Sequence, residues 1–208
     1  MAHSRVISRR VLFDGDPWMR LVALTVQRGG ERIEWTAVER KAGDRLVEDI
    51  VAVFAVTEDG DVVCTELLRP PLVRDVSINR SDQVRTLELP AGLCDMDSET
   101  LKSAARRELR EETGYEAAEF IRIPVAPESA GMARTRVYLL LASGCRKVCE
   151  PDLEKAERVM QLQTVLLPLD RLPEALARYR LEHGTIIDHK IAAGAFWWKH
   201  YQERPRTA

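Results

Sequence analysis

The 208-residue sequence contains no run of about 18 apolar residues, so we expect no membrane-spanning helix. Its four cysteines lie at irregular spacings, which favours reduced structural thiols over a disulfide framework or a zinc site. An excess of one charge is also lacking, because 31 basic side chains stand against 33 acidic ones. A surface so balanced does not favour nucleic-acid binding. The first residues lack the apolar segment of a secretory signal, so we expect a cytoplasmic protein.

Short alternating apolar segments separated by glycine- and proline-containing turns predict strands that precede and surround one helix. The order indicates an α+β protein of the α/β/α sandwich type, with a mixed sheet between helices and an antiparallel β piece in front. We expect a first segment over 1–47, a main domain over 48–203 and a tail over 204–208. The expected strands are 18–27, 32–40, 50–57, 61–68, 84–90, 119–125, 136–142 and 161–167, and the expected helices are 99–113, 170–182 and 186–203.

The stretch "RRELREETG" at 106–114 ends the expected helix with an electrostatic conflict. A helix C-terminus carries a partial negative charge and favours cations, yet three glutamates lie in its last turns. Glu108 and Glu112 are four residues apart and therefore share one face. One interpretation is a solvated face on which neighbouring arginines offset the repulsion. The other is a site for a hard cation such as Mg²⁺, which prefers oxygen ligands and is often bound together with substrate phosphates.

The surrounding stretch, residues 87–115, resembles the signature motif of the Nudix hydrolases. That motif has a glycine, a glutamate, an Arg-Glu pair, a Glu-Glu pair and a final glycine at set spacings. From Glu99 onward the spacing is met in full, whereas six residues instead of five separate Gly92 from Glu99. The matching positions are Gly92, Glu99, Arg107, Glu108, Leu109, Glu111, Glu112, Gly114 and Tyr115.

The resemblance implies a Nudix fold and the metal-dependent hydrolysis of a nucleoside diphosphate linked to another group. Mg²⁺ is the implied cofactor, with Mn²⁺ as the alternative. The implied metal ligands are Glu108, Glu111, Glu112 and the carbonyl of Ala91, and Arg107 is implied to orient the glutamates by ion pairing. Glu111 and Glu112 are also implied to take part in catalysis.

Further segments resemble the branch of the family that hydrolyses ADP-ribose and other ADP-sugars to a nucleoside monophosphate and a sugar phosphate. They include "LLRPP" (67–71), "LELPAGL" (87–93), "ESAGM" (128–132) and the N-terminal "WMRL" and "EWTAVER". This likeness implies a homodimer formed through the N-terminal sheet, with adenine stacked between tryptophans from opposite subunits. The implied substrate-binding residues are Trp18, Trp35, Arg40, Arg69 and Leu93, the last through its backbone.

One departure concerns the general base, which in this branch is a glutamate shortly before a late Pro-Leu pair. Met160 and Gln163 occupy the corresponding places here, and neither side chain can accept a proton from water at neutral pH. Glu157 is the expected substitute, with Glu111 as the alternative. The loop over 72–83 differs in a further way that could alter the sugar pocket. The alternatives left open are a UDP-sugar or GDP-mannose hydrolase, and a catalytically weak module that binds nucleotide sugars.

Overall fold

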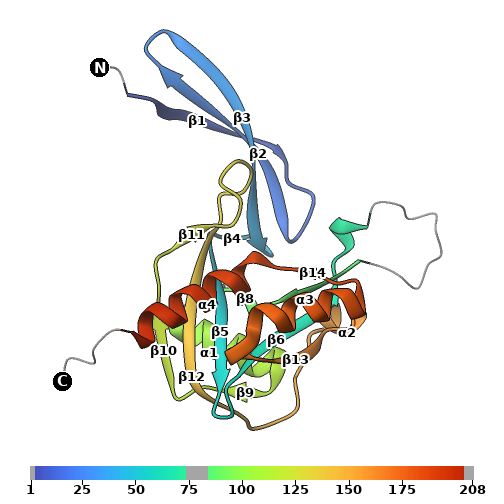
Figure 1. Ribbon diagram of the computed structural model, residues 1–208. Coiled ribbons are helices and arrows are strands. Elements are labelled where there is room, and N and C mark those ends of the chain that lie inside the picture. Colours follow the sequence, from blue (N-terminus) through green and yellow to red (C-terminus); the bar gives the residue numbers. More distant parts are fainter. Residues whose placement is uncertain (1–2, 74–83, 204–208) are drawn as a thin grey trace. The chain divides into compact units, whose positions relative to one another are not determined.

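The computed structural model describes residues 3–73 and 84–203 (Figure 1). The chain divides into two compact units. Unit 1 comprises residues 1–50, 93–99 and 125–138, and unit 2 comprises residues 51–92, 100–124 and 139–208. No helix within the described residues is both long and apolar enough to cross a membrane.

An antiparallel sheet forms the N-terminal part of unit 1. Its strands are β1 (Arg5–Phe13), β2 (Met19–Arg28), β3 (Glu31–Ala42) and β4 (Arg45–Val47), hydrogen-bonded in that order. The separate N-terminal antiparallel sheet is therefore confirmed. The sequence prediction missed β1, because every residue of that strand is exposed and no buried face imposes an alternating pattern.

The main sheet follows the order β10–β12–β5–β6–β7–β14. Its strands β5 (Asp49–Thr57) and β6 (Asp61–Leu68) are almost entirely buried and carry much of the apolar core. The sheet is mixed, since β14 runs parallel to β7 whereas β7 is antiparallel to β6. The remaining strands are β7 (Arg85–Glu88), β8 (Ala91–Leu93), β9 (Tyr115–Glu116), β10 (Glu119–Arg122), β11 (Ala126–Pro127), β12 (Arg136–Lys147), β13 (Gln163–Pro168) and β14 (Ile186–Ile187).

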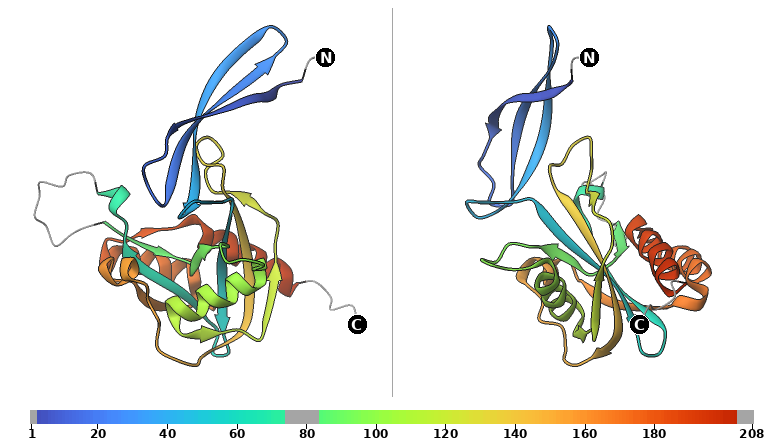
Figure 2. Two further views of the ribbon diagram at one scale, coloured as in Figure 1. Left: turned by 180° about the vertical axis from the view of Figure 1, so that it is seen from behind. Right: turned by 90° about the vertical axis from the view of Figure 1, so that its left-hand side faces the viewer.

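Helices cover both faces of the sheet in unit 2, which confirms the predicted sandwich. Figure 2 shows α1 (Leu101–Thr113) on one face, and α3 (Leu172–His183) and α4 (His189–Gln202) on the other. Gly194 of α4 lies against Phe54 so closely that a Cβ at this position would be 2.2 Å from the ring. Trp198 of α4 packs on the same residue, with its ring centroid 6.1 Å from that of Phe54.

Several predicted boundaries were wrong for local reasons. Helix α1 begins at Leu101 rather than at residue 99, because Thr100 forms a capping box with Ser103. The expected helix over 186–203 begins only at His189, since residues 186–187 form the short strand β14 and Asp188 caps α4. A short helix, α2 (Lys155–Val159), was not predicted, and two 3₁₀ turns lie at Pro70–Leu72 and Leu169–Arg171. Most of the unusual 72–83 loop lies outside the described residues.

Candidate active site

The last turns of α1 bring two glutamates against the strand-to-helix connection. Glu108 and Glu112 are both buried, at 7% and 6% exposure, on the side of α1 that packs on the sheet. The Ala91 N–H donates to Glu112 Oε2 at 3.1 Å. A Cβ on Gly92 would lie only 2.1 Å from the Glu108 carboxylate, so this approach requires glycine. The motif glycine and the motif glutamates are therefore in direct apposition.

Burial makes these carboxylates reluctant to ionise. The pKa of Glu108 is raised to about 7, chiefly by burial, while Arg107 opposes the rise and repulsion from Glu111 and Glu157 adds to it. The pKa of Glu112 is also well above its usual range, first through burial and then through repulsion from Glu108 and Glu157. Two buried carboxyl groups that repel each other create a negative electrostatic potential, which favours the binding of a cation.

Arg107 holds the cluster together from the same helix. Its Nη1 donates to Glu108 Oε1 at 2.7 Å and to Glu111 Oε2 at 3.1 Å. The latter pair spans i to i+4, the spacing at which helical side chains meet. This contact is the ion pairing that the family resemblance implied. Arg107 bonds to Oε1 of Glu108 and the Ala91 N–H bonds to Oε2 of Glu112, and each carboxylate has a second oxygen that these contacts do not occupy.

The donor set fits a hard divalent cation. Among residues 3–73 and 84–203, no three His, Cys, Asp or Glu side chains already converge as a complete ligand set. The two buried carboxylates nevertheless present oxygens on one face, next to the Ala91–Gly92 backbone, where no Cβ intervenes. Carboxylate and carbonyl oxygens are the ligands that Mg²⁺ and Mn²⁺ prefer.

Glu157 lies in α2 and within electrostatic reach of this cluster. Burial raises the pKa of Glu157, and repulsion from Glu154 and Glu111 adds to the effect. The same carboxylate raises the pKa of both Glu108 and Glu112. Its Oε2 accepts the Glu154 N–H at 2.6 Å, so the helix cap positions the carboxylate.

Gln163 serves a structural purpose instead. Its Nε2 donates to Glu66 Oε2 at 2.5 Å, and Thr185 donates to the other oxygen of Glu66 at 2.7 Å. Met160 caps the end of α2. The place where the resemblance led us to look for a base therefore carries an exposed glutamine whose side chain is hydrogen-bonded to the buried Glu66.

Arg69 is held in a fixed orientation beside the cluster. Its Nε and Nη2 donate to the two oxygens of Glu88 at 2.6 and 2.7 Å. The Glu88 pair raises the pKa of Arg69, and attraction to Glu112 adds to it, which places the guanidinium within electrostatic range of the glutamate cluster. Thr86 also donates to Glu88 Oε1, at 2.5 Å.

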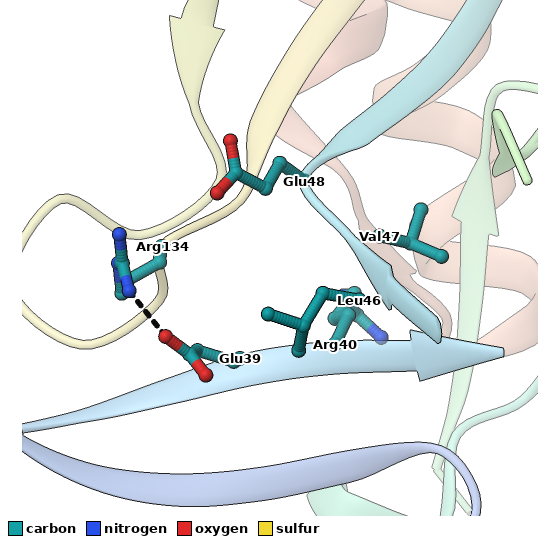
Figure 3. Close-up of a pocket in the computed structure, with 6 residues that line it drawn as sticks. All are labelled: Glu39, Arg40, Leu46, Val47, Glu48 and Arg134. Carbon is teal, nitrogen blue, oxygen red and sulfur yellow. Dashed lines mark hydrogen bonds and ion pairs between the residues drawn. The ribbon is translucent and has the colours of Figure 1, made fainter. Parts of the chain in front are cut away.

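The other predicted substrate residues belong to unit 1. Trp18 and Trp35 are both largely exposed, at 62% and 49%. The Trp35 Nε1–H donates to the carbonyl of Gly131 at 2.8 Å, and Arg40 pairs with Glu128. Leu93 ends β8 and is half-buried. A small pocket of unit 1 is lined by Glu39, Arg40, Leu46, Val47, Glu48 and Arg134 (Figure 3).

Sequence reasoning missed four charged residues that organise the predicted ones: Glu39, Glu88, Glu128 and Arg134. Each of them pairs with a residue distant in the sequence, for example Glu39 with Arg134 and Arg69 with Glu88. The one available signal was an acidic residue at a buried position of a strand, as in "TLELP", where Glu88 stands between leucines. A strand pattern marks such a residue as unusual but cannot identify its partner.

Comparison with known proteins agrees with this geometry. The NUDIX domain matches residues 49–189. An ADP-ribose pyrophosphatase of Bacillus subtilis is 32% identical over 140 residues, covering 67% of this chain and 70% of its own length. One of Mycobacterium tuberculosis is 33% identical over 110 residues, covering 53% of this chain and half of its own length. A crystal structure of an ADP compounds hydrolase superposes with a TM-score of 0.69 over 97% of both chains at 15% identity, which shows a shared fold.

Proposed function

The chain belongs to the NUDIX family, as a hydrolase acting on pyrophosphate bonds, and from this premise we propose that its substrate is ADP-ribose. Hydrolysis of the pyrophosphate bond by water would give AMP and ribose 5-phosphate. The identity to two ADP-ribose pyrophosphatases supports this substrate.

The observation that carries the proposal is the apposition of two buried glutamates to Ala91 and Gly92. Glu108 and Glu112 would hold a divalent cation, Mg²⁺ or Mn²⁺, with Glu111 and the Ala91 carbonyl as further ligands. Such a cation supplies charge neutralisation at the diphosphate and activation of a water when bound. The raised pKa of Glu108, about 7, reflects burial and repulsion that a cation would relieve.

Glu157 is the proposed general base. Its carboxylate lies within electrostatic reach of the glutamate cluster, and burial raises its pKa above the usual value, which makes it a stronger base. Arg69 would bind a phosphate oxygen. Within residues 3–73 and 84–203, Glu88 takes the Nε and Nη2 edge of this guanidinium, and the Nη1 side is the part proposed to meet the phosphate.

Trp18 and Trp35 are proposed to stack on adenine in a homodimer. The backbone of Trp18 pairs with Lys41, six residues beyond Trp35 on β3, which corresponds to about 20 Å along a strand. Two tryptophans that far apart cannot enclose one base. A second copy, which brings its own Trp18 or Trp35, would complete the sandwich. The exposed apolar side chains of the N-terminal sheet, including Val6, Phe13 and Ile33, are consistent with such an interface.

The proposal is tested by incubating the protein with ADP-ribose, ADP-glucose, UDP-glucose or GDP-mannose plus Mg²⁺ or Mn²⁺, with products separated by anion exchange. AMP and ribose 5-phosphate from ADP-ribose, at the highest kcat/KM of the panel, are expected. Preference for UDP-glucose or GDP-mannose would overturn the substrate and retain the reaction class. Light scattering after size exclusion should give the mass of a dimer.

A second candidate is a nucleotide-sugar-binding module with weak catalysis. The commitment of Gln163 to Glu66 favours it, because that position offers no carboxylate. Metal-dependent binding of ADP-ribose without release of AMP would identify this function.

A further inference from the structure

The segment 128–134 is joined to β3 along its length, entirely within unit 1. The Val38 N–H donates to the Met132 carbonyl at 2.7 Å, and the Arg134 N–H donates to the Val38 carbonyl at 3.0 Å. Val38 and Ala133 form a parallel bridge. The segment therefore extends the edge of β3 by backbone hydrogen bonds at the position between Trp35 and Arg40.

Side chains of β3 on both sides of this bridge also contact the segment. Glu128 receives two hydrogen bonds from Arg40, one from Nε at 3.1 Å to Oε2 and one from Nη2 to Oε1. The Gly131 carbonyl accepts the Trp35 indole N–H at 2.8 Å. A bidentate pair fixes the plane of a guanidinium, and a bonded indole N–H fixes the rotation of its ring. The segment thus orients Trp35, which our functional proposal assigns to adenine, and Arg40, which the family resemblance implies as a substrate residue.

A buried ion cluster anchors the segment. Arg134 pairs with Glu39, whose exposed fraction is only 4% (Figure 3). Arg9 and Arg20 engage the same carboxylate, at 2.8 Å from Arg9 Nε to Oε1 and 2.7 Å from Arg20 Nε to Oε2. Hydrogen bonds from Arg9, and then from Arg20 and Arg134, lower the pKa of Glu39 to about 2 against the effect of burial. Glu39 is therefore ionised at neutral pH, and Arg134 is bound to a fixed charge.

We propose that Glu128 and Arg134 are positioning residues for nucleotide recognition, because they hold Arg40 and Trp35 through segment 128–134. The inference rests on the proposed function, since it takes Trp35 and Arg40 as ligand-binding residues. Glu128 engages the Nε and Nη2 edge of Arg40 and leaves the Nη1 side for an anion of the ligand. Arg134 fixes the segment from its other end. Loss of either residue should weaken ligand binding while leaving the chemistry at α1 unchanged.

The test compares Arg134→Ala, Arg134→Lys and Glu128→Gln with Arg10→Ala in the full-length protein. Arg10 makes an exposed ion pair to Glu34 of the same strand β3, and among the described residues no hydrogen bond or ion pair joins Arg10 or Glu34 to segment 128–134. Two quantities are measured: the Kd of AMP by calorimetry without divalent metal, and KM and kcat for ADP-ribose with Mg²⁺. Thermal unfolding of each variant reports whether it folds.

We expect Arg134→Ala and Glu128→Gln to raise both Kd and KM about tenfold, equivalent to about 1.4 kcal/mol, with kcat changed less than twofold. Arg134→Lys should bind AMP more tightly than Arg134→Ala, because the lysine ammonium retains the positive charge. It should bind less tightly than the wild type, because it lacks the paired N–H donors of the guanidinium. Arg10→Ala should match the wild type. If Arg134→Ala does not fold, Glu128→Gln, which leaves the Glu39 cluster intact, decides the matter.

The outcomes separate this inference from the functional proposal. Unchanged Kd and KM in both variants, or an equal change in Arg10→Ala, would overturn the positioning role while AMP release from ADP-ribose still supports the function. A wild-type protein that binds AMP in an Arg134-dependent manner but releases no AMP from ADP-ribose would overturn the function and retain the positioning role. A wild-type protein that does not bind AMP overturns the positioning role.

Discussion

Glu88 holds Arg69 by both of its oxygens, at 2.6 and 2.7 Å, and is itself 8% exposed while Arg69 reaches solvent. A buried carboxylate thus fixes the plane of a partly exposed guanidinium. Burial opposes ionisation of Glu88, but the Arg69 hydrogen bonds and charge keep its pKa below the usual value. The pair is therefore charged at neutral pH, and Arg69 is attracted electrostatically to Glu112 of α1.

Glu88→Gln should raise KM for the nucleotide sugar about tenfold and lower the free energy of unfolding by about 1–3 kcal/mol, because the Arg69 fork loses one charged acceptor. Steady-state kinetics and urea unfolding measure the two effects. The matched control is Glu182→Gln, which breaks an exposed pair with Arg178 on α3 and should change neither quantity. An unaltered KM in Glu88→Gln would show that Arg69 does not bind substrate.

Glu112→Gln should lower kcat at least about 100-fold, since removal of one charged group that stabilises a transition state commonly costs that much. It should also remove the rise in melting temperature that Mg²⁺ gives the wild type. The metal-free variant should be no less stable than the metal-free wild type, because a buried repulsive carboxylate has been neutralised. Glu116→Gln, four residues beyond Glu112 and partly exposed, serves as the control. Retention of wild-type kcat at saturating Mg²⁺ would refute the metal assignment.

Glu157→Gln should lower kcat by about 10²–10⁴-fold with KM nearly unchanged, because glutamine keeps the shape and the cap contact to Glu154 but accepts no proton. The fall in rate on the acidic side of the pH–rate profile, which reports protonation of the general base, should also change in this variant. Glu150→Gln alters an exposed carboxylate paired with Lys147 and should leave kcat and KM unchanged. A fully active Glu157→Gln would move the base to another carboxylate, with Glu111 the next to test.

Gly92→Ala should abolish most activity and reduce stability, because the new Cβ would lie 2.1 Å from the Glu108 carboxylate. The Glu108 carboxylate, the far end of a flexible side chain, would have to swing away from Gly92 and leave the position proposed for metal binding. Gly30→Ala provides the comparison, since nothing lies within 4 Å of a Cβ at that position. Circular dichroism melts and activity with ADP-ribose distinguish the two variants, and equal behaviour would argue against the close approach.

The Glu39 cluster should make unit 1 sensitive to acid. The pKa of Glu39 lies at about 2 when folded and near 4.5 when unfolded, chiefly because of Arg9, so its stabilisation is present above pH 4.5 and is lost as pH falls toward 2. The pKa difference corresponds to at most about 3 kcal/mol. Urea unfolding between pH 2 and 6 should show this loss in the wild type and a smaller one in Glu39→Gln. If the free energy of unfolding falls equally with pH in the wild type and in Glu39→Gln, the cluster is not a source of acid sensitivity.

The sequence by itself determined the parts of this protein that depend on local pattern. Spacing along α1 placed Glu108 and Glu112 on one face, and strand alternation predicted β2, β3, β5 and β6, because both signals arise from the backbone periods of helix and strand. Capping by Thr100 shifted the start of α1, a decision between adjacent polar residues that the sequence left open.

Only the tertiary structure decided which distant residues meet. It joined Arg69 to Glu88, Arg134 to Glu39 and Gln163 to Glu66, and it brought Glu157 within reach of the glutamate cluster. These pairings depend on which strands become neighbours and which side chains are buried together, and no local pattern encodes either. A glutamate in a strand can be recognised as costly to bury. The arginine that makes its burial tolerable is identified only once the chain has folded.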